Sequence, residues 1–192
     1  MTVVAGVLNF ASAKNPGGGF LKGSLAQEES IAIASTLYAC QTYPPVYKPF
    51  YGYHASHPTP LYSHRLIVSP NVVVFRDSKS LAFLPEPYSV SVITCAAVNA
   101  GDAAKKHVPA SEVRTAMEHR IRHVLAAAAA SSMEHLVLGA FGCGVFRNDP
   151  AHVAQTFRQL LRGEFSHSFA SATFAIPDVA GENSRAFAPF FG

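Results

Sequence analysis

The feature that most constrains this chain lies near its start, where an apolar segment runs into three consecutive glycines and then into a helical pattern. The apolar segment covers residues 3–10, the glycines are residues 17–19, and the helical pattern extends from about residue 25 to residue 37. Three adjacent residues without Cβ atoms can turn sharply, adopt positive φ and bring their N–H groups against an anionic ligand. The junction predicts a buried strand whose C-terminal end delivers a ligand loop, as in open α/β sheets.

Two acids open the expected helix. Ser24 and Gln27 have the spacing of a capping box, so Glu28 and Glu29 are expected in the first helical turn. Each part also has a simpler interpretation, because glycine runs are usually loops and acids in a first turn usually complement the helix dipole. The combination of the parts, rather than any one of them, points to a functional site.

Composition predicts one globular unit. With 192 residues, of which 49% are apolar and 14% charged, the chain is expected to form a single domain over residues 1–192. No apolar run approaches the roughly 20 residues of a membrane span. The apolar start has no basic segment before it, so we expect a strand rather than a signal peptide, and no membrane partner.

Cysteine usage and charge limit the classes of partner. Cys40, Cys95 and Cys143 are odd in number and widely spaced, which fits reduced thiols in a cytoplasmic or nuclear protein and matches no zinc pattern. The formal net charge of +3 is too small and too dispersed for direct nucleic-acid reading, although it favours an anionic ligand. We expect neither a metal nor a cofactor, and a monomer.

The middle of the chain changes character. Residues 41–69 carry five prolines with tyrosines between them, a density that predicts a long ordered loop and argues against a long helix or an inner strand. Residues 65–68 and 72–76 then read as two short strands followed by a polar turn at 77–80, a hairpin-like excursion. Residues 90–97 form a β-branched run typical of a buried strand, ended by turn chemistry at 99–102.

The C-terminal half alternates between helix and strand. The longest helix is expected over residues 111–131, with an apolar stripe, and a strand over residues 135–141. Asp149 and Pro150 read as the N-cap and first residue of a helix that reaches about residue 161. A last strand at 173–176 and a short helix or loop at 182–191 complete the pattern, which predicts an α/β layer with helices on both faces.

A second glycine loop, residues 142–144, follows the strand expected at 135–141. It looks like half of a dinucleotide fingerprint, but the third glycine is missing and no acid closes a following strand, so nicotinamide binding is weakly supported. A Walker loop is excluded because no Gly-Lys-Ser/Thr occurs. Two glycine loops at strand ends would instead grip one diphosphate from both sides with backbone N–H groups and helix N-termini.

Taken together, the triple glycine, seven intervening residues and then Gln27-Glu28-Glu29 resemble the signature of poly(ADP-ribose) glycohydrolases of the macrodomain superfamily, in their short bacterial and fungal form. The likeness continues through residues 62–77, 87–101 and 139–148 and covers essentially the whole chain. It implies a macrodomain-like three-layer α/β/α fold with a central mixed sheet. It also implies hydrolysis of the ribose–ribose O-glycosidic bonds of poly(ADP-ribose), with release of ADP-ribose.

The resemblance assigns roles residue by residue. Glu29 looks like the catalytic residue, with Glu28 and Gln27 as partners that order the ribose across the scissile bond. Phe146 looks like the aromatic that closes over the terminal ribose, with a core aromatic as the alternative. Asn9 or Ser12 stands where a polar ribose contact is usual. The diphosphate cradle is expected from Gly17, Gly18, Gly19, Gly142, Cys143, Gly144 and Val145.

One departure from the family concerns adenine. Macrodomains normally begin with an earlier strand that ends in an aspartate for the adenine amino group, and this sequence begins at what resembles the second strand, so the usual first strand is apparently absent. Asn183 and Phe187 are candidates for holding adenine by position alone. Surface packing is the alternative interpretation for both residues.

The two acids suggest a mechanism. A glycosidic bond breaks through an oxocarbenium-like transition state and needs an acid to protonate the leaving oxygen. A helix N-terminus favours the ionised form of Glu29, whereas the Glu28 charge and a bound diphosphate favour its protonated form. The expected partners are poly(ADP-ribose), ADP-ribose and ADP-ribosylated proteins. An ADP-ribose reader, a mono-ADP-ribosyl hydrolase and a structural domain with degenerate loops stay open as alternatives.

Overall fold

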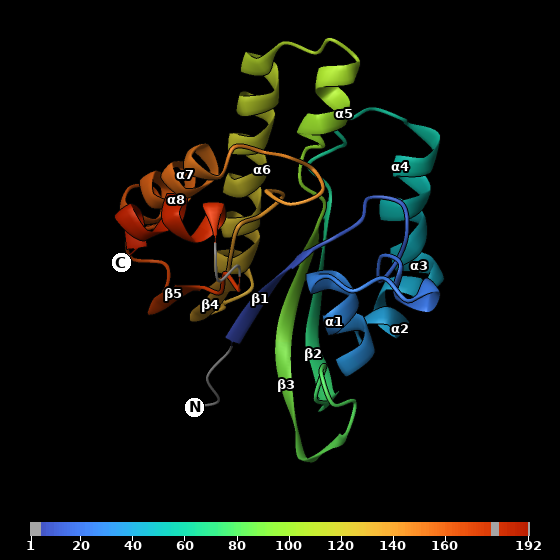
Figure 1. The fold of residues 1–192 in the computed structure, drawn as a ribbon. Coiled ribbons are helices and arrows are strands. Elements are labelled where there is room, and N and C mark those ends of the chain that lie inside the picture. The colour runs from blue at the N-terminus through green and yellow to red at the C-terminus, as the bar shows by residue number, and fades with distance from the viewer. Residues whose placement is uncertain (1–4, 178–180, 192) are drawn as a thin grey trace.

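A five-stranded mixed sheet forms the centre of the computed structural model, which describes residues 5–177 and 181–191 (Figure 1). The strand order is β2-β3-β1-β4-β5. β1 is parallel to β3 and β4, β4 is parallel to β5, and β2 is antiparallel to β3. The strands are β1 (Ala5–Phe10), β2 (Leu66–Arg76), β3 (Phe83–Cys95), β4 (His135–Leu138) and β5 (Ser171–Phe174).

Helices cover the two faces of this sheet (Figure 1). One face carries α1 (Gln27–Ala34) and α2 (Leu37–Thr42), which contact β1 and β2. The other face carries α6 (Ala110–Ala130), which packs on β3, and then α7 (Pro150–Arg162) and α8 (Glu182–Phe191). The expected three-layer α/β/α arrangement with a central mixed sheet is confirmed. The shorter elements are η1 (Phe20–Lys22), α3 (Pro44–Tyr47), η2 (Lys48–Gly52), α4 (Tyr53–Ser56) and α5 (Ala100–Lys105).

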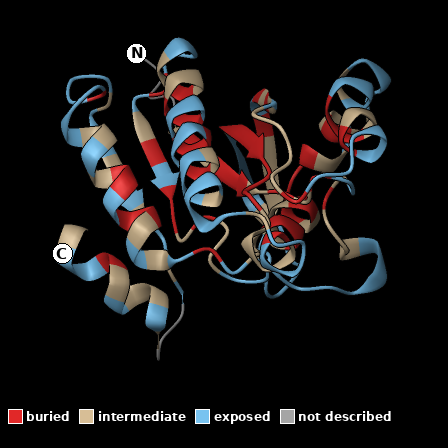
Figure 2. Ribbon diagram, turned by 90° about the horizontal axis from the view of Figure 1, so that it is seen from above, coloured by how far each residue is buried: buried red, intermediate tan, exposed pale blue. Residues whose placement is uncertain are grey.

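Buried residues lie on the strands and along the helices that cover the sheet (Figure 2). Alternation along β3 sends Ile93 into the large core beneath α6 and α7, and its neighbour Val92 into a smaller cluster with Leu37 of α2. This division follows from strand geometry, since successive side chains point to opposite faces of a sheet. The apolar stripe expected on the longest helix is also found, with its buried members at Met117, Ile121, Val124 and Leu125.

The segment expected to be a long loop contains helix, so that prediction is wrong for residues 44–56. Pro44 and Pro45 occupy the first turn of α3, where the missing N–H groups of proline are tolerated. Pro49 likewise lies at the start of the π-helical turn η2. These turns bury Phe50 and Tyr51, so tertiary packing overrides the proline density.

Two expectations on the first helix are also wrong. The helix begins at Gln27 with Ala26 as its N-cap, so Ser24 does not open a capping box. The helix also ends at Ala34 rather than continuing to residue 37. The link to α2 pairs with the outer edge of β2, where Thr36 N–H donates to the Val73 carbonyl and Val73 N–H donates to Thr36 Oγ1. A backbone that joins the sheet edge cannot also continue the helix.

Elsewhere, local sequence patterns predicted the positions of strands and helix starts closely. The two short strands expected at 65–68 and 72–76 form one strand, β2, with an irregularity between Ser69 and Val72, and this strand pairs antiparallel with β3. Asp149 caps α7 and Pro150 begins it, as predicted. Asn99 does not form the expected turn but caps α5, where its Oδ1 accepts from Asp102 N–H at 3.0 Å.

Arg120 ties the long helix to the edge of the sheet that carries the loops. It is 1% exposed, and its guanidinium donates to the Ala96 carbonyl and, at 2.8 Å, to the Leu61 carbonyl. Its Nε donates to His64 Nδ1 at 3.1 Å. Ala96 directly follows β3 and Leu61 precedes β2, so one buried side chain joins three segments.

Replacing Arg120 with methionine is expected to lower the free energy of unfolding by about 3 kcal/mol, because two buried carbonyls lose their donors. Urea unfolding measures this loss. Arg122→Met is the matched control, since Arg122 is exposed and pairs with Glu164 at 2.6 Å. That surface pair is expected to contribute far less, because solvent screens it. Equal losses in the two variants would contradict the anchoring role of Arg120.

Candidate active site

The two glycine loops lie together at one edge of the sheet. β1 ends at Phe10 and β4 ends at Leu138, and because these strands are parallel their carboxyl ends reach the same edge. Between the loops and the start of α1 lies a cavity of about 340 Å³. Its lining residues are Phe10, Ala11, Ser12, Gly18, Ala26, Gln27, Glu28, Glu29, Ala140, Gly142, Gly144, Val145 and Phe146.

The first glycine loop presses its backbone against the acid pair. Gly17 and Gly18 have φ of 64° and 63°, a conformation that favours glycine. A Cβ built on Gly18 would overlap Glu29 Oε1 and lie 3.1 Å from Glu28 Oε2. The loop is therefore glycine-rich both because its backbone turns left-handed and because two carboxyl groups occupy the space beside it.

The N–H groups of this loop are already bonded to protein acceptors. Gly17 N–H donates to Gln41 Oε1 at 2.9 Å, Gly18 N–H donates to the Asn15 carbonyl at 3.0 Å, and Gly19 N–H donates to Glu29 Oε1 at 2.9 Å. The sequence predicted these groups as phosphate donors. In this structure they shape the loop and hold Glu29 instead, and phosphate binding by this loop stays a prediction.

Glu28 is buried and firmly held, at 4% exposure. Its Oε2 accepts from Ser12 N–H at 2.6 Å and its Oε1 accepts from Asn9 Nδ2 at 3.4 Å. Burial raises the pKa of Glu28 to about 7, against the hydrogen bonds from Ser12, Asn9 and Gln41, which lower it, and with the charge of Glu29, which raises it. Near neutral pH the carboxyl group therefore exchanges a proton readily.

Glu29 presents a different environment. It is 8% exposed, and Oε1 accepts from Gly19 N–H. Within residues 5–177 and 181–191, Oε2 of Glu29 takes part in no protein hydrogen bond. Glu28 has both oxygens engaged by the protein, whereas Glu29 keeps one oxygen available in the cavity that both residues line.

The side chain of Gln27 bonds to the backbone of β1. Its Oε1 accepts from Phe10 N–H at 2.8 Å and its Nε2 donates to the Leu8 carbonyl at 2.7 Å. The pairing of β1 with β4 extends as far as Val7 opposite Val137. The amide of Gln27 bonds to the backbone of β1 just beyond that point. This pairing fixes the first turn of α1 against β1 and so places the two acids that follow. A ribose contact by Gln27 stays a prediction.

Asn9 and Ser12 lie on different sides of Glu28. Asn9 is completely buried, and its amide donates to Glu28 and to Thr94 Oγ1 at 3.2 Å. Ser12 lines the cavity, and its hydroxyl accepts from the N–H groups of Lys14 and Asn15. Of the two candidates for a polar ribose contact, Ser12 is thus the one beside the cavity. Both roles stay predictions.

The second glycine loop offers open backbone donors. Gly142 has φ of 73°, and a Cβ there would overlap the Cβ of Ala97. Asn148 Nδ2 braces the loop by donating to the Gly142 and Val98 carbonyls at 2.9 and 2.8 Å. In the part of the chain that the structure describes, no protein acceptor is bonded to the N–H groups of Gly142, Gly144, Val145 and Phe146. Consecutive free N–H groups in a tight turn form an anion-binding concavity.

Side chains of this loop divide between core and solvent. Phe146 lines the cavity and also packs on the large core, with its ring 5.9 Å from that of Tyr62. Val145 is 90% exposed. Burial raises the pKa of the Cys143 thiol to about 12, and this thiol donates to the Phe141 carbonyl, so it is an unreactive group at neutral pH.

The two adenine candidates lie on α8. Phe187 is 2% exposed and packs on Phe174, with ring centroids 5.5 Å apart. Neither Asn183 nor Phe187 is among the described residues that line the cavity. Packing, the alternative interpretation, accounts for Phe187 in this arrangement, and the adenine roles stay predictions.

Sequence reasoning missed the residues behind the acids. Gln41, Tyr51 and Thr94 are completely buried, and Gln41 and Thr94 are bonded to each other. A signal existed for one of them: Gln41 follows Leu37 by four residues, which places both on one face of a helix. A glutamine that shares an inward face with a leucine must find polar partners inside the protein.

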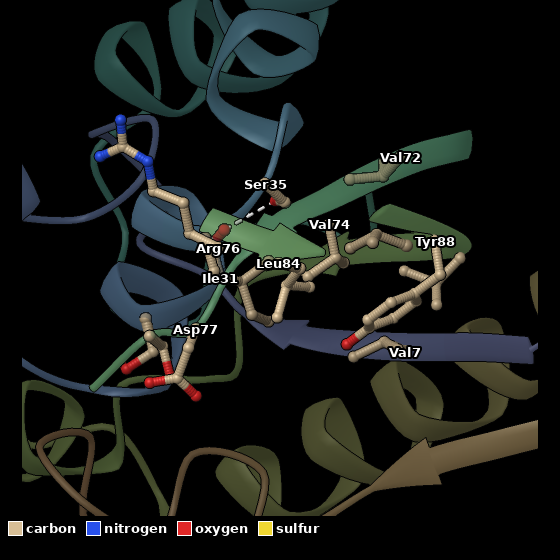
Figure 3. A pocket seen from close by; sticks show the side chains of 14 residues that line it. Val7, Ile31, Ser35, Val72, Val74, Arg76, Asp77, Leu84 and Tyr88 are labelled. Carbon is tan, nitrogen blue, oxygen red and sulfur yellow. Dashed lines mark hydrogen bonds between the residues drawn. The ribbon is translucent and has the colours of Figure 1, made fainter. Parts of the chain in front are cut away.

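A second cavity, of about 320 Å³, lies between another side of α1 and the sheet (Figure 3). Most of the lining side chains labelled in the figure are aliphatic, namely Val7, Ile31, Val72, Val74 and Leu84. Asp77 stands at its rim, with Oδ1 accepting from Lys79 N–H and from Ser80. This cavity carries no pair of carboxyl groups, so the chemistry belongs to the cavity between the glycine loops.

Among residues 5–177 and 181–191, no group of three or more His, Cys, Asp or Glu side chains could hold a metal ion. In the same part of the chain, no helix is both long enough and apolar enough to cross a membrane.

Known proteins resemble this chain in sequence and in structure. Residues 2–77 match the family described as the catalytic domain of microbial-type PARG, where PARG is poly(ADP-ribose) glycohydrolase. PARG from Deinococcus radiodurans in complex with ADP-ribose is 45% identical, with a TM-score of 0.90 over 98% of this chain and 75% of that one. No curated protein sequence matches the chain.

A second organism supplies equally similar structures. PARG from Thermomonospora curvata is 45% identical, with a TM-score of 0.90 over 98% of this chain and 68% of that one. The same protein bound to the inhibitor ADP-HPD is 44% identical, with a TM-score of 0.90 over 98% of this chain and 71% of that one. Likeness at this level, over nearly the whole length, goes well beyond a shared fold. The chain belongs to the microbial-type poly(ADP-ribose) glycohydrolase family.

Proposed function

We propose that this chain hydrolyses the ribose–ribose O-glycosidic bonds of poly(ADP-ribose) and releases ADP-ribose. The observation that carries the proposal is the cavity in which Glu28 and Glu29 of α1 face the second glycine loop with its open N–H groups. The relatives add support, since D. radiodurans PARG binds ADP-ribose and T. curvata PARG binds ADP-HPD. An acid pair beside an anion site is what cleavage next to a diphosphate requires.

The geometry supports a division of labour between the acids. Glu29, with Oε2 unbonded within the described residues, donates a proton to the departing ribose oxygen as the bond from that oxygen to the anomeric carbon breaks. A water molecule then attacks the anomeric carbon and returns a proton to the Glu29 carboxylate. Glu28, held by Ser12 and Asn9, stays in place to order the ribose. One water is consumed for each bond broken, and the proton given to the leaving oxygen is replaced by one from the attacking water.

The remaining lining residues position the substrate. The N–H groups of the second glycine loop would hold the diphosphate, and Phe146 would close over the terminal ribose. Placing the reacting bond against a fixed carboxyl group contributes to the rate, because a misplacement of about 1 Å can cost roughly 10²-fold. The first glycine loop contributes indirectly, through its bond to Glu29 and the space that Gly18 leaves for both acids.

Purified poly(ADP-ribose) incubated with the protein is expected to yield free ADP-ribose, measured by chromatography. A mono-ADP-ribosylated protein serves as the parallel substrate. ADP-ribose is also expected to raise the melting temperature more than AMP does, because a ligand at about 100 times its Kd stabilises the folded state by roughly 2.7 kcal/mol. Tight binding of ADP-ribose without release from the polymer would favour a reader. Release from the mono-ADP-ribosylated protein alone would favour the mono-ADP-ribosyl hydrolase.

We further propose that the polymer reaches the site on ADP-ribosylated proteins and that the chain acts as a monomer. A net charge of +3 supports attraction to such an anionic ligand without a strong basic surface for nucleic acid. A cytoplasmic or nuclear location and a single domain over residues 1–192 stay predictions.

A further inference from the structure

A group of polar side chains, the buried polar cluster, lies behind the acid pair. Its members are 4% exposed or less. Burying so many polar groups together is costly unless they satisfy one another. Asn9, Glu28, Gln41 and Thr94 are linked by hydrogen bonds, whereas Asn9 Oδ1 and the Tyr51 hydroxyl have no partner within the described residues. The buried polar cluster consists of Asn9, Glu28, Gln41, Tyr51 and Thr94.

Gln41 joins the buried polar cluster to the first glycine loop. From α2, its Oε1 accepts from Gly17 N–H at 2.9 Å, and its Nε2 donates to Thr94 Oγ1 of β3 at 3.3 Å. Thr94 Oγ1 also accepts from Asn9 Nδ2 at 3.2 Å, and Asn9 Nδ2 donates to Glu28 Oε1 at 3.4 Å. Gln41 thus contacts the glycine loop and the sheet directly and is linked to Glu28 through Thr94 and Asn9.

The chemistry of these contacts requires an amide. Gly17 N–H needs an acceptor, so the oxygen of Gln41 faces the loop and the NH₂ group must face Thr94 and Glu28. A carboxylate could serve Gly17 but would place a second charge beside Glu28, where exposure is close to zero. An apolar side chain of the same length would leave the Gly17 N–H without its acceptor.

We propose that Gln41 is a positioning residue for the acid pair. By accepting from Gly17 N–H, it holds the left-handed turn in which Gly18 leaves room for both carboxyl groups and Gly19 N–H binds Glu29. By donating to Thr94, which also accepts from Asn9, it supports the amide that holds Glu28, and its own amide lowers the pKa of that carboxyl group. Gln41 is 0% exposed and is not among the residues that line the cavity, so it acts through Glu28 and Glu29 rather than on the substrate. The inference deepens the function proposed above and rests on it.

The titratable groups around Glu28 are few. Glu29 faces it from the same helix, and Tyr51 faces it from η2. The other groups that act on the pKa of Glu28 are the uncharged Asn9, Ser12 and Gln41. Burial raises the pKa of Tyr51, with a further rise from the charge of Glu28, so Tyr51 stays neutral at working pH. A change in the titration of Glu28 after substitution of Gln41 can therefore be assigned to the lost amide.

Gln41→Met keeps the length of the side chain and removes both hydrogen-bonding functions. Turnover of poly(ADP-ribose) is expected to fall about 10–100-fold in kcat, because the acids lose their fixed position, with a smaller change in KM. The pKa of Glu28, followed by ¹³C NMR of the glutamate carboxyl carbons, is expected to move above its value of about 7. The control is Gln155→Met, an exposed glutamine of α7, for which neither quantity should change.

Gln41→Glu separates the two halves of the role. It keeps an acceptor for Gly17 N–H but replaces the NH₂ group, which lowers the pKa of Glu28, with a second carboxyl oxygen, so the pKa of Glu28 should rise further than in Gln41→Met. If Gln41→Met does not fold, this variant and the conservative Thr94→Val, which removes the acceptor for Gln41 Nε2, carry the same NMR test. Thr94→Val should also shift the Glu28 titration.

The proposed function and the positioning role of Gln41 are overturned by different results. A parent protein that releases nothing from the polymer overturns the proposed function, while the Glu28 titration still tests the contact of Gln41 with the acid. Folded Gln41 variants with parental kcat and an unchanged Glu28 titration overturn the positioning role. A variant that is only less stable, with parental turnover per folded molecule, makes Gln41 a structural residue and overturns the inference too.

Discussion

Glu29→Gln is expected to slow the release of ADP-ribose from poly(ADP-ribose) by about 10²–10⁴-fold, the usual contribution of general acid–base catalysis. The substitution keeps size and leaves an oxygen that can accept from Gly19 N–H, and it deletes the proton that the leaving oxygen needs. ADP-ribose binding should survive, because the open donors of the second glycine loop are backbone groups that the change leaves alone. Rates from single-turnover assays and affinities from calorimetry measure the two effects separately.

Two further acids make this experiment specific. Glu112 lies in the first turn of α6 and is exposed, so Glu112→Gln tests whether any acid at a helix start matters and should leave the rate unchanged. Glu28→Gln removes a group whose pKa is about 7, so the rate profile should lose an inflection near that pH. Parental turnover by Glu29→Gln would return Glu29 to the role of a helix-dipole acid. Collapse in Glu28→Gln alone would transfer the acid role to Glu28.

Gly18→Ala is expected to reduce kcat by about 10²-fold or more, because the added methyl group displaces the carboxyl groups on which the reaction depends. Its Cβ would overlap Glu29 Oε1, lie 2.9 Å from Glu29 Cδ and lie 3.1 Å from Glu28 Oε2. The φ of +63° adds backbone strain for any L side chain. Turnover per folded molecule, with the folded fraction measured by urea unfolding, checks the effect.

Gly23→Ala is the matched control for this variant. Gly23 follows η1 in the same region and has a φ of +81°, but a Cβ there meets nothing within 4 Å. It therefore shares the backbone strain of Gly18→Ala and lacks the collision with the acids. We expect a stability loss of about 1 kcal/mol and parental turnover. Equal turnover in the two variants would show that the acids tolerate displacement, and would contradict the tight fit at Gly18.

Sequence patterns that span only a few residues predicted much of the fold. The apolar stripe with a period of 3.6 residues placed α6, and the Asp149-Pro150 pair placed the start of α7, because caps and helix faces depend on neighbours along the chain. The approach of the two glycine loops was also accessible from sequence. Parallel strands bring their carboxyl ends to one edge, so loops after β1 and β4 had to meet there.

Where local preferences conflict with tertiary packing, the predictions from sequence were wrong. Prolines argued against helix over residues 44–56, yet each of Pro44, Pro45 and Pro49 lies in the first turn of its short element, and the segment buries Phe50 and Tyr51. The capping-box spacing of Ser24 and Gln27 was equally local. It yields to the pairing of the Gln27 amide with β1, which satisfies two backbone groups of the strand at once.

The order strand, glycine loop and acid pair was determined by the sequence itself, because chain connectivity alone places Glu28 and Glu29 just after the loop that follows β1. The burial and the hydrogen bonding of those acids were decided by the tertiary structure. Gln41 lies 24 residues from Gly17 and 53 from Thr94, and the exposure of Glu28 falls to 4% only when the loop, α1 and the buried polar cluster close around it. Desolvation and hydrogen bonding across such separations set the pKa of Glu28, and no spacing along the chain encodes them.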